Sequence, residues 1–257
     1  MSPRAPVLFV TWQAPESRRF FPIARVLRLP GGGYEWAYLR AVREACAHGF
    51  AGLPGLEDLE AIGVSAELPE PLSHRVPSRR SRRSASRPQV ANDVLDPAPI
   101  TLLVPVGSGR HERLEVFAPP LPAPLSNAWG VFMARGVGRV PGSQVAVEAL
   151  APHEPLRLEP EPDNAYNPRA IRLSRRDGVA LGYVPDYLAN ELAEALAPGE
   201  LASSRLRVEV ADVERFHSPP AEPGYQLSCR YTCDAGLGER LFDSESYQPL
   251  APAAYPL

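Results

Sequence analysis

Lysine is absent from this chain of 257 residues, and all 27 of its Lys-or-Arg residues are arginine. The absence excludes a Schiff-base nucleophile, a lysine general base and the lysine of a phosphate-binding loop. Arginine instead offers a planar fork of donors that matches phosphate oxygens and stacks on bases. A GC-rich coding sequence would produce the same usage, so this composition alone does not identify a partner.

Cysteine and long apolar runs are also scarce. The three cysteines, Cys46, Cys229 and Cys233, have no disulfide-framework spacing, which indicates a reducing compartment. The apolar run before Gln13 is too short for a signal peptide, and no run reaches the roughly 18 apolar residues that a membrane helix requires. We therefore expect a soluble cytoplasmic protein without a membrane partner.

Proline is abundant. The 31 prolines limit the length of any helix, while 44% hydrophobic and 22% charged residues are values typical of folded proteins. The chain is long enough for two small domains, each with its own core. Short apolar runs separated by turn signals predict a mainly β protein with a few helices, in the α+β class.

Four regions follow from the pattern. Residues 1–72 are expected to form a small α+β domain, in which Gly31, Gly32 and Gly33 turn a hairpin and a helix ends near Gly49. Residues 73–127 are predicted as an Arg-rich and Pro-rich linker with short strands. Residues 128–233 contain five or six short strands, which suit a small barrel or a curled sheet. Residues 234–257 are expected to be an irregular tail.

The linker contains a strongly basic segment. Residues 74–87 include six arginines and no acidic residue. The segment is either a solvated linker or an electrostatic arm that attracts a phosphate backbone without reading its sequence. The arm residues are Arg79, Arg80, Arg82 and Arg83.

The third region contains the most specific motif, EPDNAYNPRAI at residues 161–171. An Asp-Gly pair at Asp177 predicts a hairpin between the two strands that follow, and the next segment, PDYLANELAEAL, has the spacing of an amphipathic helix. Polar residues of the motif, such as Asn164, are also ordinary loop residues that bond their own backbone. The motif is therefore either a structural turn or the rim of a binding site.

The order of GVGRVP, the EPDNAYNPRAI loop, the strand end LGYVP and a helix resembles the HIRAN domain. That domain occurs in the helicase-like transcription factor, in related Rad-type repair translocases and in stand-alone bacterial proteins. The resemblance covers about residues 128–233 and implies an OB-like or SH3-like β-barrel that binds single-stranded DNA, in the repair proteins through a free 3′ end. Aromatic faces would stack bases while arginines follow the phosphates.

The resemblance also implies a set of binding residues. Tyr166 would be the stacking platform and Asn167 would occupy the position of an aspartate that holds the terminal hydroxyl. The arginine near Gly138 is displaced by one position, and the two aromatics expected after it are absent. The candidate nucleic-acid-binding residues are Arg135, Arg139, Asp163, Asn164, Tyr166, Asn167, Arg169, Tyr183 and Tyr225.

Catalytic patterns are not evident in the sequence. The segment GSGR at residues 107–110 lacks the Lys-Ser/Thr pair of a phosphate loop, and the histidines have no zincin spacing. Cys46, His48, Cys229 and Cys233 do not have the spacing of a standard zinc finger. We therefore expect a protein that is not an enzyme and has no catalytic residue, metal or cofactor.

The function that we expect is recognition of single-stranded or damaged DNA, with a repair or replication protein as a further partner. One alternative is an adaptor for protein interaction that has lost its DNA pocket. Another is an accessory subunit of a hydrolase or repair enzyme with a metal site that the sequence does not reveal. A basic surface with an aromatic floor around residues 163–169 would favour DNA, and an acidic or filled surface would favour the adaptor.

Overall fold

The structure is a computed structural model in which most of the regular structure is β-sheet, accompanied by a few short helices. The residues form two compact units, each described here by itself. Unit 1 contains the described residues up to 72, residues 114–119 and residues 242–252, and unit 2 contains the described residues from 120 to 241. The structure describes residues 7–69, 72, 114–196, 200–202, 205–216 and 224–252.

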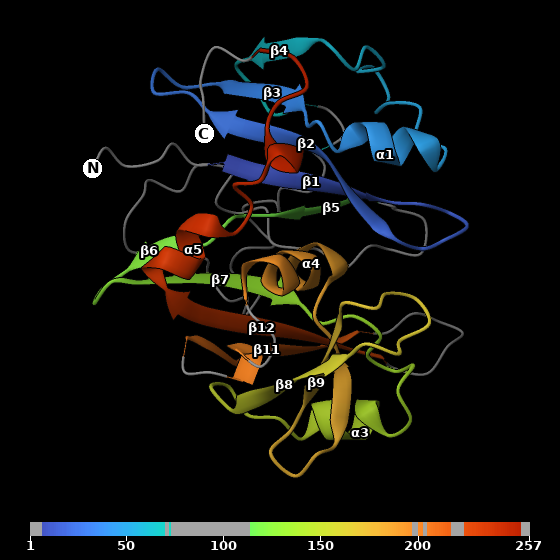
Figure 1. Cartoon of the computed structure of the whole chain (residues 1–257), viewed down its shortest axis with the longest axis vertical. Coiled ribbons are helices and arrows are strands. Elements are labelled where there is room, and N and C mark those ends of the chain that lie inside the picture. The colour runs from blue at the N-terminus through green and yellow to red at the C-terminus, as the bar shows by residue number, and fades with distance from the viewer. Residues whose placement is uncertain are drawn as a thin grey trace. The chain divides into compact units, whose positions relative to one another are not determined.

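Unit 1 is built on an antiparallel sheet in the order β4-β3-β2-β1-β5 (Figure 1). The predicted hairpin at the glycines is confirmed, because β2 pairs with β3 and residues 29–33 connect them. The predicted helix is also present. The elements of unit 1 are β1 (Val7–Gln13), β2 (Phe20–Arg28), β3 (Tyr34–Tyr38), α1 (Val42–Ala47), β4 (Ile62–Ser65) and β5 (Leu114–Phe117).

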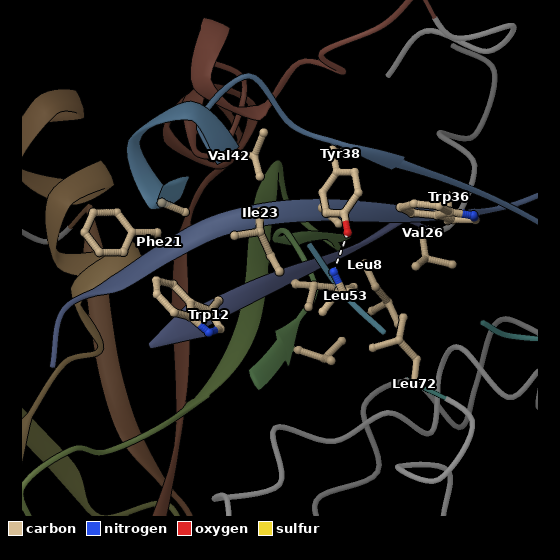
Figure 2. Close-up of a cluster of buried hydrophobic side chains, with 14 of the residues drawn as sticks. Leu8, Trp12, Phe21, Ile23, Val26, Trp36, Tyr38, Val42, Leu53 and Leu72 are labelled. Carbon is tan, nitrogen blue, oxygen red and sulfur yellow. Dashed lines mark hydrogen bonds between the residues drawn. The ribbon is translucent and has the colours of Figure 1, made fainter. Parts of the chain in front are cut away.

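One face of this sheet carries a core of large apolar side chains (Figure 2). Alternate residues of the strands point to this face, among them Trp12, Ile23 and Trp36. The hydroxyl of Tyr38 accepts a hydrogen bond from the Leu53 N–H at 2.7 Å and donates to the Leu56 carbonyl at 2.6 Å. The one polar group that the ring brings to this face is thus satisfied.

The last part of the chain returns to unit 1. The Leu250 N–H donates to the Tyr38 carbonyl at 2.8 Å, and the ring of Tyr247 lies 4.9 Å from the ring of Phe9. The sequence predicts an irregular tail from residue 234, whereas the described part of that range contains helix α5 (Ala235–Arg240) and the 3-10 turn η4 (Glu245–Tyr247). Apolar periodicity did not reveal this packing because the contacts join residues about as far apart as the chain allows.

Unit 2 is built on a larger antiparallel sheet in the order β10-β9-β8-β11-β12-β7-β6. The predicted hairpin at Asp177-Gly178 is confirmed by the pairing of β9 with β10. The helix predicted from the amphipathic pattern is α4, whose residues Leu188 and Leu192 are buried. The elements are β6 (Leu121–Ala123), β7 (Asn127–Met133), α3 (Ser143–Glu148), β8 (Pro155–Glu161), β9 (Ala170–Ser174), β10 (Ala180–Tyr183), α4 (Asp186–Ala195), η3 (Glu200–Ala202), β11 (Leu206–Phe216) and β12 (Gly224–Asp234).

The predicted OB-like or SH3-like β-barrel is not confirmed, because the sheet of unit 2 is not a closed ring. Among the described residues, a single isolated bridge, between Arg135 and Tyr183, joins the chain after β7 to β10. The chain leaves the extended conformation at Gly136, where φ is +70°, so the ladder cannot continue. The strand β6 adds an edge beyond β7 rather than closing the sheet.

The chain approaches itself closely at the bridge. A Cβ atom on Gly182 would lie 2.5 Å from the Arg135 carbonyl oxygen, so the bridge requires a glycine there. The two backbone hydrogen bonds of the bridge are both 2.8 Å long. They hold the turn of residues 136–139 over β10. Among the described residues, no helix is long and apolar enough to cross a membrane.

Candidate nucleic-acid interface

The loop of residues 162–169, called the Asn loop below, connects β8 to β9 and is organised by the side chain of Asn164. Its Oδ1 accepts hydrogen bonds from the N–H groups of Tyr166 at 3.0 Å and Asn167 at 3.2 Å. Its Nδ2 donates to Glu161 Oε2 at 3.1 Å. Such bonds from an asparagine to its own loop are the structural role expected of this residue type. Asn164 therefore fixes the backbone of the loop.

Asn167 anchors the same loop to helix α4. Its Nδ2 donates to Asp186 Oδ1 at 3.0 Å and to Asn190 Oδ1 at 3.3 Å, and its Oδ1 accepts from the Arg169 N–H at 2.9 Å. This pattern requires an amide, because a carboxylate at position 167 could not donate to Asp186. The asparagine that departs from the family pattern is therefore a structural link in this chain.

The following turn of α4 contacts Arg169 of the loop through Glu194. The Nη1 of Arg169 donates to Glu194 Oε1 at 2.5 Å, and the two side chains are 47% and 55% exposed. Asp186, Asn190 and Glu194 follow one another at intervals of four residues, so they lie along one face of the helix. We call these three residues the α4 stripe. The stripe was not among the residues predicted from the sequence, although its four-residue spacing is present in PDYLANELAEAL.

Tyr166 is the aromatic residue of the Asn loop, and it is exposed to solvent. Its side chain is 79% exposed, although its backbone N–H is bonded to Asn164. Single exposed apolar side chains are ordinary on protein surfaces, so this exposure offers a ring face to a ligand without identifying the ligand. Asp163 and Arg169 beside it are exposed as well.

Tyr183 joins the network through Glu161. Burial raises the pKa of Tyr183, and its hydrogen bond with Glu161 raises that pKa further. Gly136 packs against the ring, since a Cβ atom there would lie 3.3 Å from it. Tyr183 also pairs with the backbone of Arg135, which is half-buried. The structure therefore brings Arg135 and Tyr183 into the same network as the Asn loop.

A second cluster of charges lies on β8 and β9. Arg172 donates through Nη2 to Glu159 at 2.8 Å and through Nη1 to Glu161 at 2.9 Å, while Ser174 Oγ donates to Glu159 at 2.8 Å. The bond from Ser174, and then those from Arg172, lower the pKa of Glu159. The fork of Arg172 is therefore engaged by two carboxylates. Sequence analysis did not select these residues, because their cross-strand pairing depends on the register of the sheet.

The remaining candidates lie apart from this network or outside the described residues. Arg139 is exposed, and its N–H closes the turn to Gly136 at 2.9 Å. Tyr225 bonds to Glu148 of α3, which raises the pKa of Tyr225, and no described contact links it to the Asn loop. The arm residues Arg79, Arg80, Arg82 and Arg83 and the strand-like segment 97–107 lie outside the described residues.

The electrostatic setting of the Asn loop is mixed. Arg169 of the loop and Arg172 of the adjoining strand β9 are each paired with glutamate. The contacts around the loop include a further carboxylate, that of Asp186. The surface thus has the exposed aromatic ring that favours DNA and the carboxylates that favour an adaptor.

The cysteines and histidines in the described residues belong to no metal-binding group. In the described part of the chain, no group of three or more His, Cys, Asp or Glu side chains is placed to hold a metal ion. Cys46, Cys229 and Cys233 are free thiols. Burial raises the pKa of Cys233 to about 11 and raises that of Cys229 as well, so both thiols are protonated near neutral pH.

Comparison with known proteins agrees with the motif. The family model of the HIRAN domain matches residues 130–217, which include the bridge, the Asn loop and α4. The crystal structure of the HIRAN domain of human HLTF is similar at 17% sequence identity and a TM-score of 0.30, over 45% of this chain and 84% of that one. No curated protein matches the chain significantly.

Proposed function

We propose that unit 2, in which residues 130–217 match the family model of the HIRAN domain, binds single-stranded DNA with an unpaired base stacked on Tyr166. HIRAN domains are DNA-binding modules. The observation that carries the proposal for this chain is the 79% exposed ring of Tyr166 on a loop held by Asn164 and Asn167. Exposed rings fixed in advance stack bases at little entropic cost.

Single strands suit this site better than duplex. A base must leave its stack and its partner before its face can lie on Tyr166, and this costs less in an unpaired strand, which has no base pair to break. Arg135 and Arg139, on the turn beside Tyr183, are candidates to follow the phosphates. The proposal includes no dependence on a 3′ hydroxyl, because both polar atoms of Asn167 are engaged within the protein.

We also propose that the domain acts by binding and performs no chemistry on the strand. The polar side chains nearest Tyr166 are committed to the loop and to α4, as the bonds of Asn164 and Asn167 illustrate. An adaptor function is the second candidate, and the pairing of Arg169 and Arg172 with carboxylates favours it.

Fluorescence anisotropy of the full chain with labelled oligonucleotides tests the proposal. We expect binding of a single strand at low salt, weaker binding of the matching duplex, and an affinity that falls steeply as salt is added. A strand ending in a 3′ phosphate should bind as well as one ending in a hydroxyl. An absence of binding at low salt contradicts DNA recognition and leaves the adaptor. Cleavage of the strand during incubation with Mg²⁺ contradicts a purely binding role.

A further inference from the structure

We infer that Glu194 of the α4 stripe competes with DNA phosphate for Arg169, so that the helix limits how strongly the Asn loop attracts a nucleic-acid backbone. The inference rests on the proposed function and concerns its regulation. Arg169 is the arginine closest in sequence to Tyr166, and its Nη1 lies 2.5 Å from Glu194 Oε1. A carboxylate therefore occupies the place where a phosphate oxygen would be expected.

The hydrogen bonds between the Asn loop and α4 place Arg169 beside Glu194. The Arg169 N–H is bonded to Asn167 Oδ1 at 2.9 Å, and Asn167 is bonded to Asp186 and Asn190 of the same helix. The three stripe residues span about 12 Å along the helix, by the usual rise per residue. Anchoring the loop at the first two of them sets Glu194 opposite Arg169.

The pair is also weak enough to exchange. Both side chains are about half exposed, and exposed ion pairs contribute little net stability because water solvates both partners well. Arg172 differs, because its fork is engaged by Glu159 and Glu161 together. A phosphate that displaces Glu194 therefore meets a small cost at Arg169, whereas displacing both partners of Arg172 would break a larger network.

Competition between Glu194 and phosphate for Arg169 changes which ligands the Asn loop binds. Glu194 opposes contacts that consist only of phosphate attraction, while stacking of a base on Tyr166 leaves the pair intact. A ligand that supplies both a base for Tyr166 and a phosphate for Arg169 overcomes the competition. Glu194 thus favours unpaired strands over polyanions that offer no base.

Glu194→Gln tests the inference in the full chain, because glutamine keeps the shape of the side chain and removes its charge. We expect the affinity for a labelled single-stranded oligonucleotide to rise about two- to fivefold, the range expected for loss of an exposed ion pair. The affinity for heparin, a polyanion without bases, should rise more. The matched control is Glu239→Gln on α5, an exposed residue with the same charge change, which should leave both affinities unchanged.

A double-mutant cycle with Arg169→Ala makes the test specific to the pair. The gain from Glu194→Gln should disappear when Arg169 is alanine. A gain that persists in the Arg169→Ala background, or an equal gain in Glu239→Gln, overturns the inference in favour of a general charge effect. Unchanged affinity in Glu194→Gln overturns it while DNA binding stands. If neither the natural chain nor any variant binds the strand, the proposed function fails and the inference falls with it.

Discussion

Two arginine–glutamate pairs of this chain have the same chemistry and opposite surroundings. In unit 1, Nη2 of Arg25 on β2 lies 3.2 Å from Oε1 of Glu35 on β3. The two side chains are 0% and 1% exposed. In unit 2, Arg169 and Glu194 are about half exposed. Burial lowers the pKa of Arg25 even though Glu35 acts in the opposite direction, which indicates that desolvation outweighs the pairing.

The difference separates a structural pair from a candidate functional one. A buried charge cannot lose its partner without a large cost, so the Arg25–Glu35 pair is fixed for as long as unit 1 is folded. An exposed pair exchanges partners with water, ions and ligands at small cost. The same residue types therefore stabilise the sheet in one unit and remain available to a ligand in the other.

The largest expected effect concerns the buried pair. Glu35→Gln should lower the free energy of unfolding by about 3 kcal/mol, because it removes the negative charge of Glu35 from beside a guanidinium that is buried in the sheet. Urea denaturation measures the loss. Glu44→Gln is the matched control in the same unit, since its pair with Arg19 is exposed, and it should cost less than about 1 kcal/mol. Equal losses in the two variants would contradict the distinction drawn from burial.

The next effect is on binding. Tyr166→Ala should weaken the affinity for a single strand by about 1 to 3 kcal/mol, because a stacking surface is removed. The variant should unfold at nearly the same temperature as the natural chain, since the ring is exposed and packs little. Tyr166→Phe keeps the ring face and should retain most of the affinity. Loss of affinity in Tyr166→Phe as well would show that the hydroxyl, and not stacking, carries the contact.

A smaller effect is expected at the link between the Asn loop and α4. Asn167→Asp should cost about 1 to 2 kcal/mol of stability, because the amide donor is lost and a carboxylate is placed beside Asp186. Adding Asp186→Asn should restore much of the loss by supplying a donor opposite the new acid. Thermal unfolding of the two variants measures this recovery. No recovery in the double variant would mean that Asn167 acts through other contacts.

The smallest effect is a dependence on pH. The pKa of Glu159 lies below its ordinary value of 4.5 because Ser174 and Arg172 donate to it. Its contribution to stability is therefore fully present above that ordinary value and is lost as the pH falls through the lowered pKa. The difference in unfolding temperature between the natural chain and Glu159→Gln should shrink below about pH 4. A constant difference across that range would contradict the assignment.

Local patterns predicted the parts of the fold that depend on neighbouring residues. The glycines at 31–33, the Asp177-Gly178 pair and the apolar spacing of α4 each act over a few residues, and the hairpins and the helix they indicate are present. The closed barrel was not confirmed, since closure depends on whether β7 and β10 pair along their length. The turn at Gly136 stops that pairing after one bridge.

At the candidate site, too, the sequence predicted residues of one local motif but not their distant partners. The motif directed attention to Tyr166 and Asn167, and Tyr166 is indeed the exposed ring of the loop. The partners of Asn167 and Arg169 could not be read from the motif, because they lie about 20 residues further on, on a helix whose orientation is set by packing. A polar stripe opposite the apolar face of that helix was the available signal.

Photocrosslinking would detect an unpaired base that lies on Tyr166. A single-stranded oligonucleotide containing 5-iodouracil would be bound to the full chain, irradiated, and the attached residue identified by mass spectrometry. We expect attachment at Tyr166, and loss of that adduct when unlabelled single strand competes. Attachment confined to residues 74–87, or to unit 1, would contradict it.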